Sequence, residues 1–152
     1  MILDKFSTFF ANLLYSSMPS FGATGALVGD VIDTGSAPTL KNLGISDGLW
    51  LVINVITTCT GATNTTRFAL CSDSTANLAT SKTIHVSTPD IPVASLVAGY
   101  RFAVKLPATA DYERYVGIWA TTLVASLTAG AFTASLVQDL PTDLVTYPDA
   151  VN

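Results

Sequence analysis

Residues 44–48 read GISDG and match the GxSxG spacing, which in hydrolases marks a nucleophilic serine on a sharp turn between a strand and a helix. Here a strongly apolar strand pattern follows Ser46, and no helix pattern does. The chain has one histidine, His85, between two β-branched residues. A single imidazole excludes a two-histidine metal site and leaves no second imidazole for a proton relay. We therefore expect a polar turn at 44–48, a structural histidine at 85 and no catalytic site.

Charged and aromatic residues gather at Asp111, Tyr112, Glu113, Arg114 and Tyr115. Two nearby carboxylates can divide acid and base roles when their environments differ. Residues adjacent in a turn rarely converge on one substrate, so we expect solvated turn charges that pair with a neighbouring subunit.

Metal and disulfide chemistry have little support. Asp30 and Asp33 could offer oxygens to calcium, but the ligand spacing of an EF-hand is absent. Cys59 and Cys71 lack CxxC spacing. A hairpin turning near 62–63 would place the two cysteines out of register and on opposite faces, too far apart for a disulfide. We expect two free packing cysteines, and neither a metal nor a cofactor.

The composition indicates a soluble β protein that works within an assembly. Hydrophobic residues make up 49% of the 152-residue chain and charged residues 12%, about half the usual share of charge. The net charge is −4 and the basic residues are scattered, which argues against nucleic-acid binding. Hydroxyl residues interrupt the apolar stretch 116–137, so we expect two strands there and no membrane span. A surface with so little charge suggests that a partner covers part of it.

The elements that must position these residues are short strands. The pattern predicts strands at 25–32, 49–59, 67–72, 83–87, 100–106, 114–124 and 131–137, with the last two joined by a loop at 128–130. We predict that 49–59 and 67–72 form a hairpin, with Phe68 opposite Thr57 and Leu70 opposite Val55. Many short strands without a long helix predict an all-β fold, an antiparallel β-sandwich or jelly roll.

The N-terminus has a different pattern, with apolar residues at the spacing of a helix. These residues are Phe6, Phe9, Phe10, Leu13 and Leu14. We expect a short amphipathic helix or an apolar arm, whose side chains either fill the domain's own core or dock on a neighbour. The predicted organisation is an arm at 1–20, a sandwich at 21–140 and a tail at 141–152.

The order of several segments resembles the capsid cement, or decoration, proteins of tailed bacteriophages that have a jelly-roll fold. The segments are MILDKF at 1–6, DVIDTG at 30–35, LWLVINV at 49–55, RYVGI at 114–118 and TAGAFTA at 128–134. The resemblance implies a protein on the outer capsid surface that binds junctions between major capsid proteins, self-associates as a homodimer or homotrimer, and assembles in the host cytoplasm. Such proteins continue in a polar segment after the opening hexapeptide, whereas this chain is apolar at 9–15.

Two functions of different classes follow. The first is a structural virion protein that stabilises the capsid. The alternative is a carbohydrate- or receptor-binding β-sandwich of a phage fibre or tail, which would show an exposed cluster such as Tyr112, Glu113 and Tyr115. Under the first hypothesis the predicted interaction residues are Phe6, Phe9, Phe10, Leu13, Leu14, Tyr112, Arg114 and Tyr115.

Overall fold

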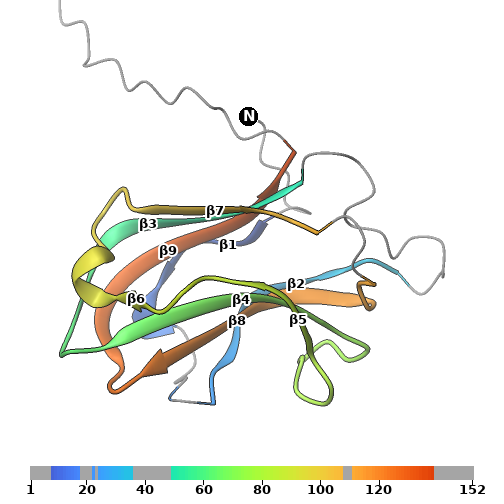
Figure 1. The fold of residues 1–152 in the computed structure, drawn as a ribbon, viewed down its shortest axis with the longest axis horizontal. Coiled ribbons are helices and arrows are strands. Elements are labelled where there is room, and N and C mark those ends of the chain that lie inside the picture. The colour runs from blue at the N-terminus through green and yellow to red at the C-terminus, as the bar shows by residue number, and fades with distance from the viewer. Residues whose placement is uncertain (1–7, 18–21, 23, 36–48, 108–110, 139–152) are drawn as a thin grey trace, which may run out of the picture.

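The computed structural model describes residues 8–17, 22, 24–35, 49–107 and 111–138, and within them the chain is built from strands (Figure 1). The strands are β1 (Thr8–Leu14), β2 (Ala26–Asp33), β3 (Trp50–Gly61), β4 (Thr65–Asp73), β5 (Thr83–Ser87), β6 (Ile91–Pro92), β7 (Arg101–Lys105), β8 (Tyr115–Leu123) and β9 (Leu127–Val137). Two single 3-10 turns, η2 (Tyr15–Ser17) and η3 (Val93–Ser95), complete the described elements.

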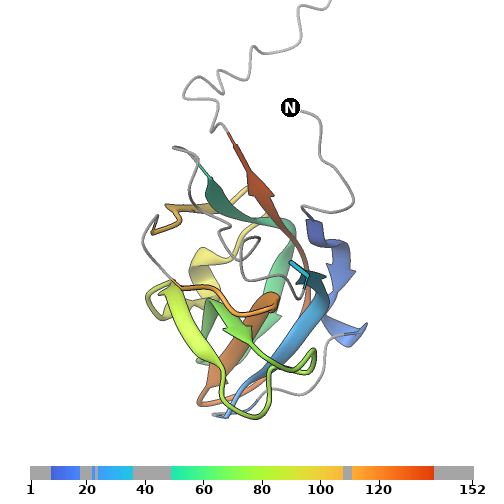
Figure 2. The same cartoon turned by 90° about the vertical axis from the view of Figure 1, so that its right-hand side faces the viewer.

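The strands form two antiparallel sheets packed face to face (Figures 1 and 2). One sheet has the order β1-β9-β3-β7, and the other has the order β2-β8-β4-β5 with β6 beside β4. The chain changes sheet at every step from β1 to β4, stays in the second sheet from β4 to β6, and changes sheet again at every step from β6 to β9. This is the strand order of a jelly roll with two Greek keys. The predicted all-β sandwich is confirmed.

The core lies between the sheets and follows from the alternation within each strand. On β3, Leu51, Ile53 and Val55 point inward and are buried. Across the interior, the rings of Phe68 on β4 and Phe132 on β9 meet edge to face with centroids 5.2 Å apart. Aromatic rings favour this geometry because the positive edge of one ring faces the negative face of the other.

The described part of the N-terminal segment is a strand, so the short amphipathic helix, one of the two structures expected for this segment, is wrong there. β1 pairs with β9, and its register shifts between Thr8 and Phe10 and again between Phe10 and Leu13. Asn12 has a positive φ of 49°. These irregularities interrupt the alternation of an ordinary strand. The adjacent residues Phe9 and Phe10 are consequently both buried. Together with Leu13, which packs against the core, they have the three- and four-residue spacing of a helix.

The predicted hairpin of 49–59 with 67–72 is also wrong, because β3 and β4 lie in different sheets. Phe68 pairs with Ala120, and Leu70 pairs with Ile118. The apolar residues of β3 and β4 therefore meet face to face across the core and not side by side. The predicted loop at 128–130 lies inside β9, and residues 124–126 connect β8 to β9.

Both cysteines are free and buried, although the hairpin from which this was inferred does not form. Cys59 belongs to the main core, whereas Cys71 lies in a smaller apolar cluster with Ala69 and Leu78. Burial raises the pKa of each thiol to about 11. The two thiols are therefore protonated at neutral pH and pack as small apolar groups. Among the described residues, no helix is long and apolar enough to cross a membrane.

Candidate functional site

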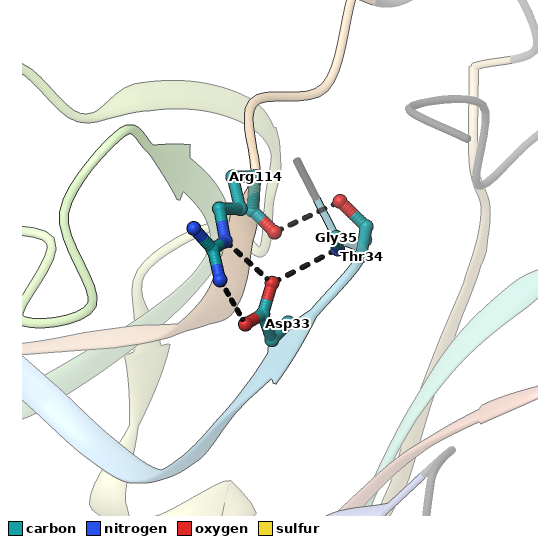
Figure 3. Close-up of polar contacts among 4 residues, drawn as sticks. All are labelled: Asp33, Thr34, Gly35 and Arg114. Carbon is teal, nitrogen blue, oxygen red and sulfur yellow. Dashed lines mark hydrogen bonds and ion pairs between the residues drawn. The ribbon is translucent and has the colours of Figure 1, made fainter. Parts of the chain in front are cut away.

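Two segments singled out in the sequence meet where β2 ends and β8 begins (Figure 3). The Arg114 guanidinium donates from Nε and Nη2 to the two carboxylate oxygens of Asp33, each at 2.8 Å. The backbone N–H of Gly35 also donates to Asp33, and the Thr34 hydroxyl donates to the Arg114 carbonyl. The hydrogen bond from Arg114 lowers the pKa of Asp33 to about 2, helped by the Gly35 N–H and opposed by desolvation. A two-pronged pair of this kind fixes the geometry of both partners.

The two tyrosines beside Arg114 have opposite environments. Tyr115 is half-buried, and the Arg114 guanidinium carbon lies 4.9 Å from its ring centroid. Tyr112 is only 2% exposed and belongs to the main core. The exposed cluster that the carbohydrate-binding alternative requires of Tyr112, Glu113 and Tyr115 is therefore not formed.

His85 lies at a bulge of β5 and contributes to packing near the start of β8. The β4–β5 register shifts between the Leu70 and Cys71 pairs, which leaves His85 without a direct partner. Its Nε2 lies 2.7 Å from the hydroxyl oxygen of Ser72, which also accepts the N–H of Glu113 at 3.0 Å. Its ring packs on Tyr112 with centroids 4.2 Å apart. Because Ser72 is fully buried, its hydroxyl is not accessible as a nucleophile.

Acid should weaken the fold through His85. Desolvation lowers the pKa of His85 below 6.5, and the charge of Glu113 opposes this shift only in part. A lowered pKa means that the fold favours neutral imidazole, so this stability is present above pH 6.5 and is lost as the pH falls through the folded pKa. His85→Gln should therefore show a flatter dependence of unfolding free energy on pH just below 6.5 than the wild type, measured by urea unfolding. Parallel curves would contradict this expectation.

The other groups that could do chemistry do not converge. Glu113 accepts a long hydrogen bond of 3.5 Å from the Thr83 hydroxyl, while Asp111 is exposed to solvent. The predicted turn at 44–48, which contains Ser46, lies outside the described residues. No group of three histidine, cysteine, aspartate or glutamate residues that could hold a metal occurs in the part of the chain that the structure describes.

The predicted arm residues divide into buried and exposed ones. Phe9 and Phe10 fill the domain's own core, and Leu13 packs against it. Leu14 is 53% exposed. Phe6 lies outside the described residues. The structure thus places β1 within the first sheet, as part of the domain and not as a separate arm. Arg114 and Tyr115 lie at the start of β8, which belongs to the other sheet.

Sequence reasoning missed a loop that folds over the outer face of the second sheet. Leu78 is fully buried there, and a side chain at Gly117 would meet its Cδ1 atom at 2.9 Å. Nearby, the Lys82 ammonium lies 4.0 Å from the ring centroid of Trp119. The Asp73 carboxylate holds the loop by accepting backbone N–H groups from both of its ends. The sequence Asp-Ser-Thr that begins the loop is a turn signal that could have indicated it.

No curated protein matches the chain. A family model described as Bbp16 matches residues 20–136, which contain β2 to β8 and nearly all of β9. The match covers most of the chain and follows the jelly-roll strands described above. The chain therefore belongs to the Bbp16 family, which is associated with bacteriophages.

Proposed function

We propose that this protein is a capsid cement protein, which binds the outer surface of an icosahedral phage capsid and stabilises contacts between major capsid proteins. The observation that carries the proposal is the jelly-roll strand order in a chain of a phage-associated family. Jelly rolls of this order are common in viral capsid domains. Fold alone does not establish function, so the surface must also suit the role.

The charges of the described residues suit contacts that do not depend on salt. Arg114 pairs with Asp33, and Arg67 pairs with Asp90 at 2.8 Å. Arg101 donates to the Asn54 side chain. Charges that are paired within one molecule are less available for pairing with a partner. Contacts to a capsid would then rest on apolar and hydroxyl groups, each weak but repeated by symmetry across the shell.

The proposal has three further parts. The protein self-associates as a homodimer or homotrimer and contacts major capsid proteins, without binding nucleic acid or membrane. It is not an enzyme, in keeping with the buried hydroxyl of Ser72 beside the one histidine. It assembles in the host cytoplasm and resides on the outer capsid surface, where Cys59 and Cys71 serve as packing residues.

Co-sedimentation with capsids tests the function directly. Purified full-length protein is mixed with DNA-free expanded capsids of its own phage, the shells are pelleted, and bound protein is counted per major capsid subunit. We expect saturation at a fixed ratio and a higher melting temperature of the saturated shells, because a ligand that binds only the assembled state stabilises it. Capsids of an unrelated phage serve as the control. Binding that never saturates, or no binding, would contradict the proposal.

A further inference from the structure

The two ends of the sandwich differ in charge. At one end, which we call the ionic end, lie the Asp33–Arg114 pair, the buried Asp73 and the exposed Lys105. The pairings of Asp33 and Asp73 with Tyr115 place them together at this end. The opposite end contains the β3–β4 and β8–β9 connections, on the left in Figure 1. We call this opposite end the neutral end, formed by 14–17, 60–64, 91–97 and 123–128 together with 22 and 24–25.

Strand pairing shows that these segments belong to one surface. Gly61 of β3 pairs with Leu127 of β9, and Thr60 and Thr128 share a hydroxyl hydrogen bond of 2.8 Å. Leu14 at the end of β1 pairs with Ala131. Residue 22 joins the same end, because its carbonyl accepts the backbone N–H of Thr122.

No residue of the neutral end carries a formal charge. The sequence has no aspartate, glutamate, lysine, arginine or histidine in three long runs, 6–29, 48–66 and 115–138. The fold gathers parts of all three runs at this end. Arg67, two residues inside β4, is neutralised by Asp90. In a soluble chain, this separation of charge leaves one end suited to contact with an uncharged surface.

Val124 projects from the neutral end in an unfavourable conformation. It is 90% exposed and has a φ of 75°. The N–H of Ala125 donates to the carbonyl of Leu123 at 3.0 Å, which makes Val124 the centre of a three-residue γ-turn. A γ-turn with positive φ is rare and strained, and a β-branched residue is especially disfavoured there. Burial within the domain does not explain valine at this position, because its side chain lies in solvent. Strained residues of this kind gather at functional surfaces.

We propose that the neutral end is the surface that docks on the capsid, with Val124 entering an uncharged apolar recess of the major capsid protein. This inference rests on the proposed cement function and adds the docking surface and the chemistry of the partner. A charged partner surface would lose its water on contact without gaining a counter-ion, so charge matching favours a neutral partner. Threonine hydroxyls around the turns can bond to backbone groups of the partner. The ionic end then faces solvent.

Val124→Gly tests the inference without threatening the fold. Glycine adopts positive φ freely, so we expect the melting temperature to stay the same or to rise. Capsid binding should weaken roughly ten-fold, because burial of a valine side chain is lost. Val124→Asn, a second substitution that tolerates positive φ, should weaken binding similarly. Binding is measured by the co-sedimentation experiment at about 0.05 and about 1 M salt, and for wild type we expect little change with salt.

Ile84→Thr provides the matched control, because Ile84 is another exposed apolar residue but lies on β5, outside the neutral end. It should bind capsids like wild type. If Val124→Gly and Val124→Asn bind as tightly as wild type, or if salt abolishes wild-type binding, docking through the neutral end is overturned while the cement function stands. If the Val124 variants lose self-association and keep capsid binding, the occupant is a second copy and the proposal is wrong. Absence of wild-type binding would overturn both proposals.

Discussion

Replacing Phe9 with alanine is expected to lower the free energy of unfolding by about 3–5 kcal/mol, the usual cost of removing a buried phenylalanine side chain. Phe9 is 1% exposed and packs between the sheets. The strand that carries it pairs with β9, and it approaches β2 so closely that a side chain at Gly29 would meet the Phe9 carbonyl oxygen at 2.7 Å. Truncation at Phe9 therefore leaves a cavity where the two sheets meet. Urea unfolding of the full-length chain measures the loss.

Leu14→Ala is the matched control, because Leu14 lies on the same strand but is 53% exposed. Its substitution should change the free energy of unfolding by no more than about 0.5 kcal/mol. Equal effects at Phe9 and Leu14 would mean that β1 is not part of the cooperative fold. Phe9 would then be free to contact a neighbour, as the arm hypothesis requires.

The sequence predicts strands better than it predicts their partners. The predicted strand at 83–87 has the same bounds as β5, and 49–59 differs from β3 only at its ends. Alternation of apolar residues is local and shows that a segment is extended and half-buried. It does not show which sheet receives the segment. In a jelly roll most partners are far apart in the chain, so the assumption that 49–59 pairs with 67–72 failed.

The same limit applies to the sites. The sequence singled out both Asp33 and Arg114, but their pairing joins positions 81 residues apart, which no local pattern indicates. Phe9 and Phe10 were identified as important, and their helical spacing misled because strand bulges can produce it. No sequence pattern indicated that Val124 is exposed and strained, because it lies in an apolar stretch and only the three-dimensional structure shows its exposure and its positive φ.

Asp73→Ala is expected to cost roughly 2–4 kcal/mol, because a buried carboxylate that accepts several hydrogen bonds is removed while its donors stay. Asp73 is fully buried and accepts the backbone N–H groups of Thr75, Thr80 and Ser81. Hydroxyl donors add to these bonds. Without the carboxylate, the loop should release Leu78 from the outer face of the second sheet. The midpoint of urea unfolding measures the cost.

The pH dependence of stability separates the charge of Asp73 from its packing. The Ser81 N–H, with further help from Thr75 and Ser74, lowers the pKa of Asp73 to about 2 against the opposing effect of desolvation. A lowered carboxyl pKa stabilises the fold above the unfolded value of 3.8, and that contribution is lost as the pH falls from 3.8 to about 2. Asp33 titrates in the same window in both proteins, so the difference between wild type and Asp73→Ala isolates Asp73.

Asp90→Ala supplies the control for an ordinary surface carboxylate. Asp90 pairs with Arg67 where both side chains are well exposed, so its loss should cost about 0–1 kcal/mol. If Asp73→Ala costs no more than Asp90→Ala, the loop is held by its apolar contacts alone. A large cost at Asp73 together with a flatter acid limb would establish that one carboxylate closes the loop over the outer sheet face. Because this loop lies at the ionic end, docking through the neutral end predicts that folded Asp73→Ala still binds capsids.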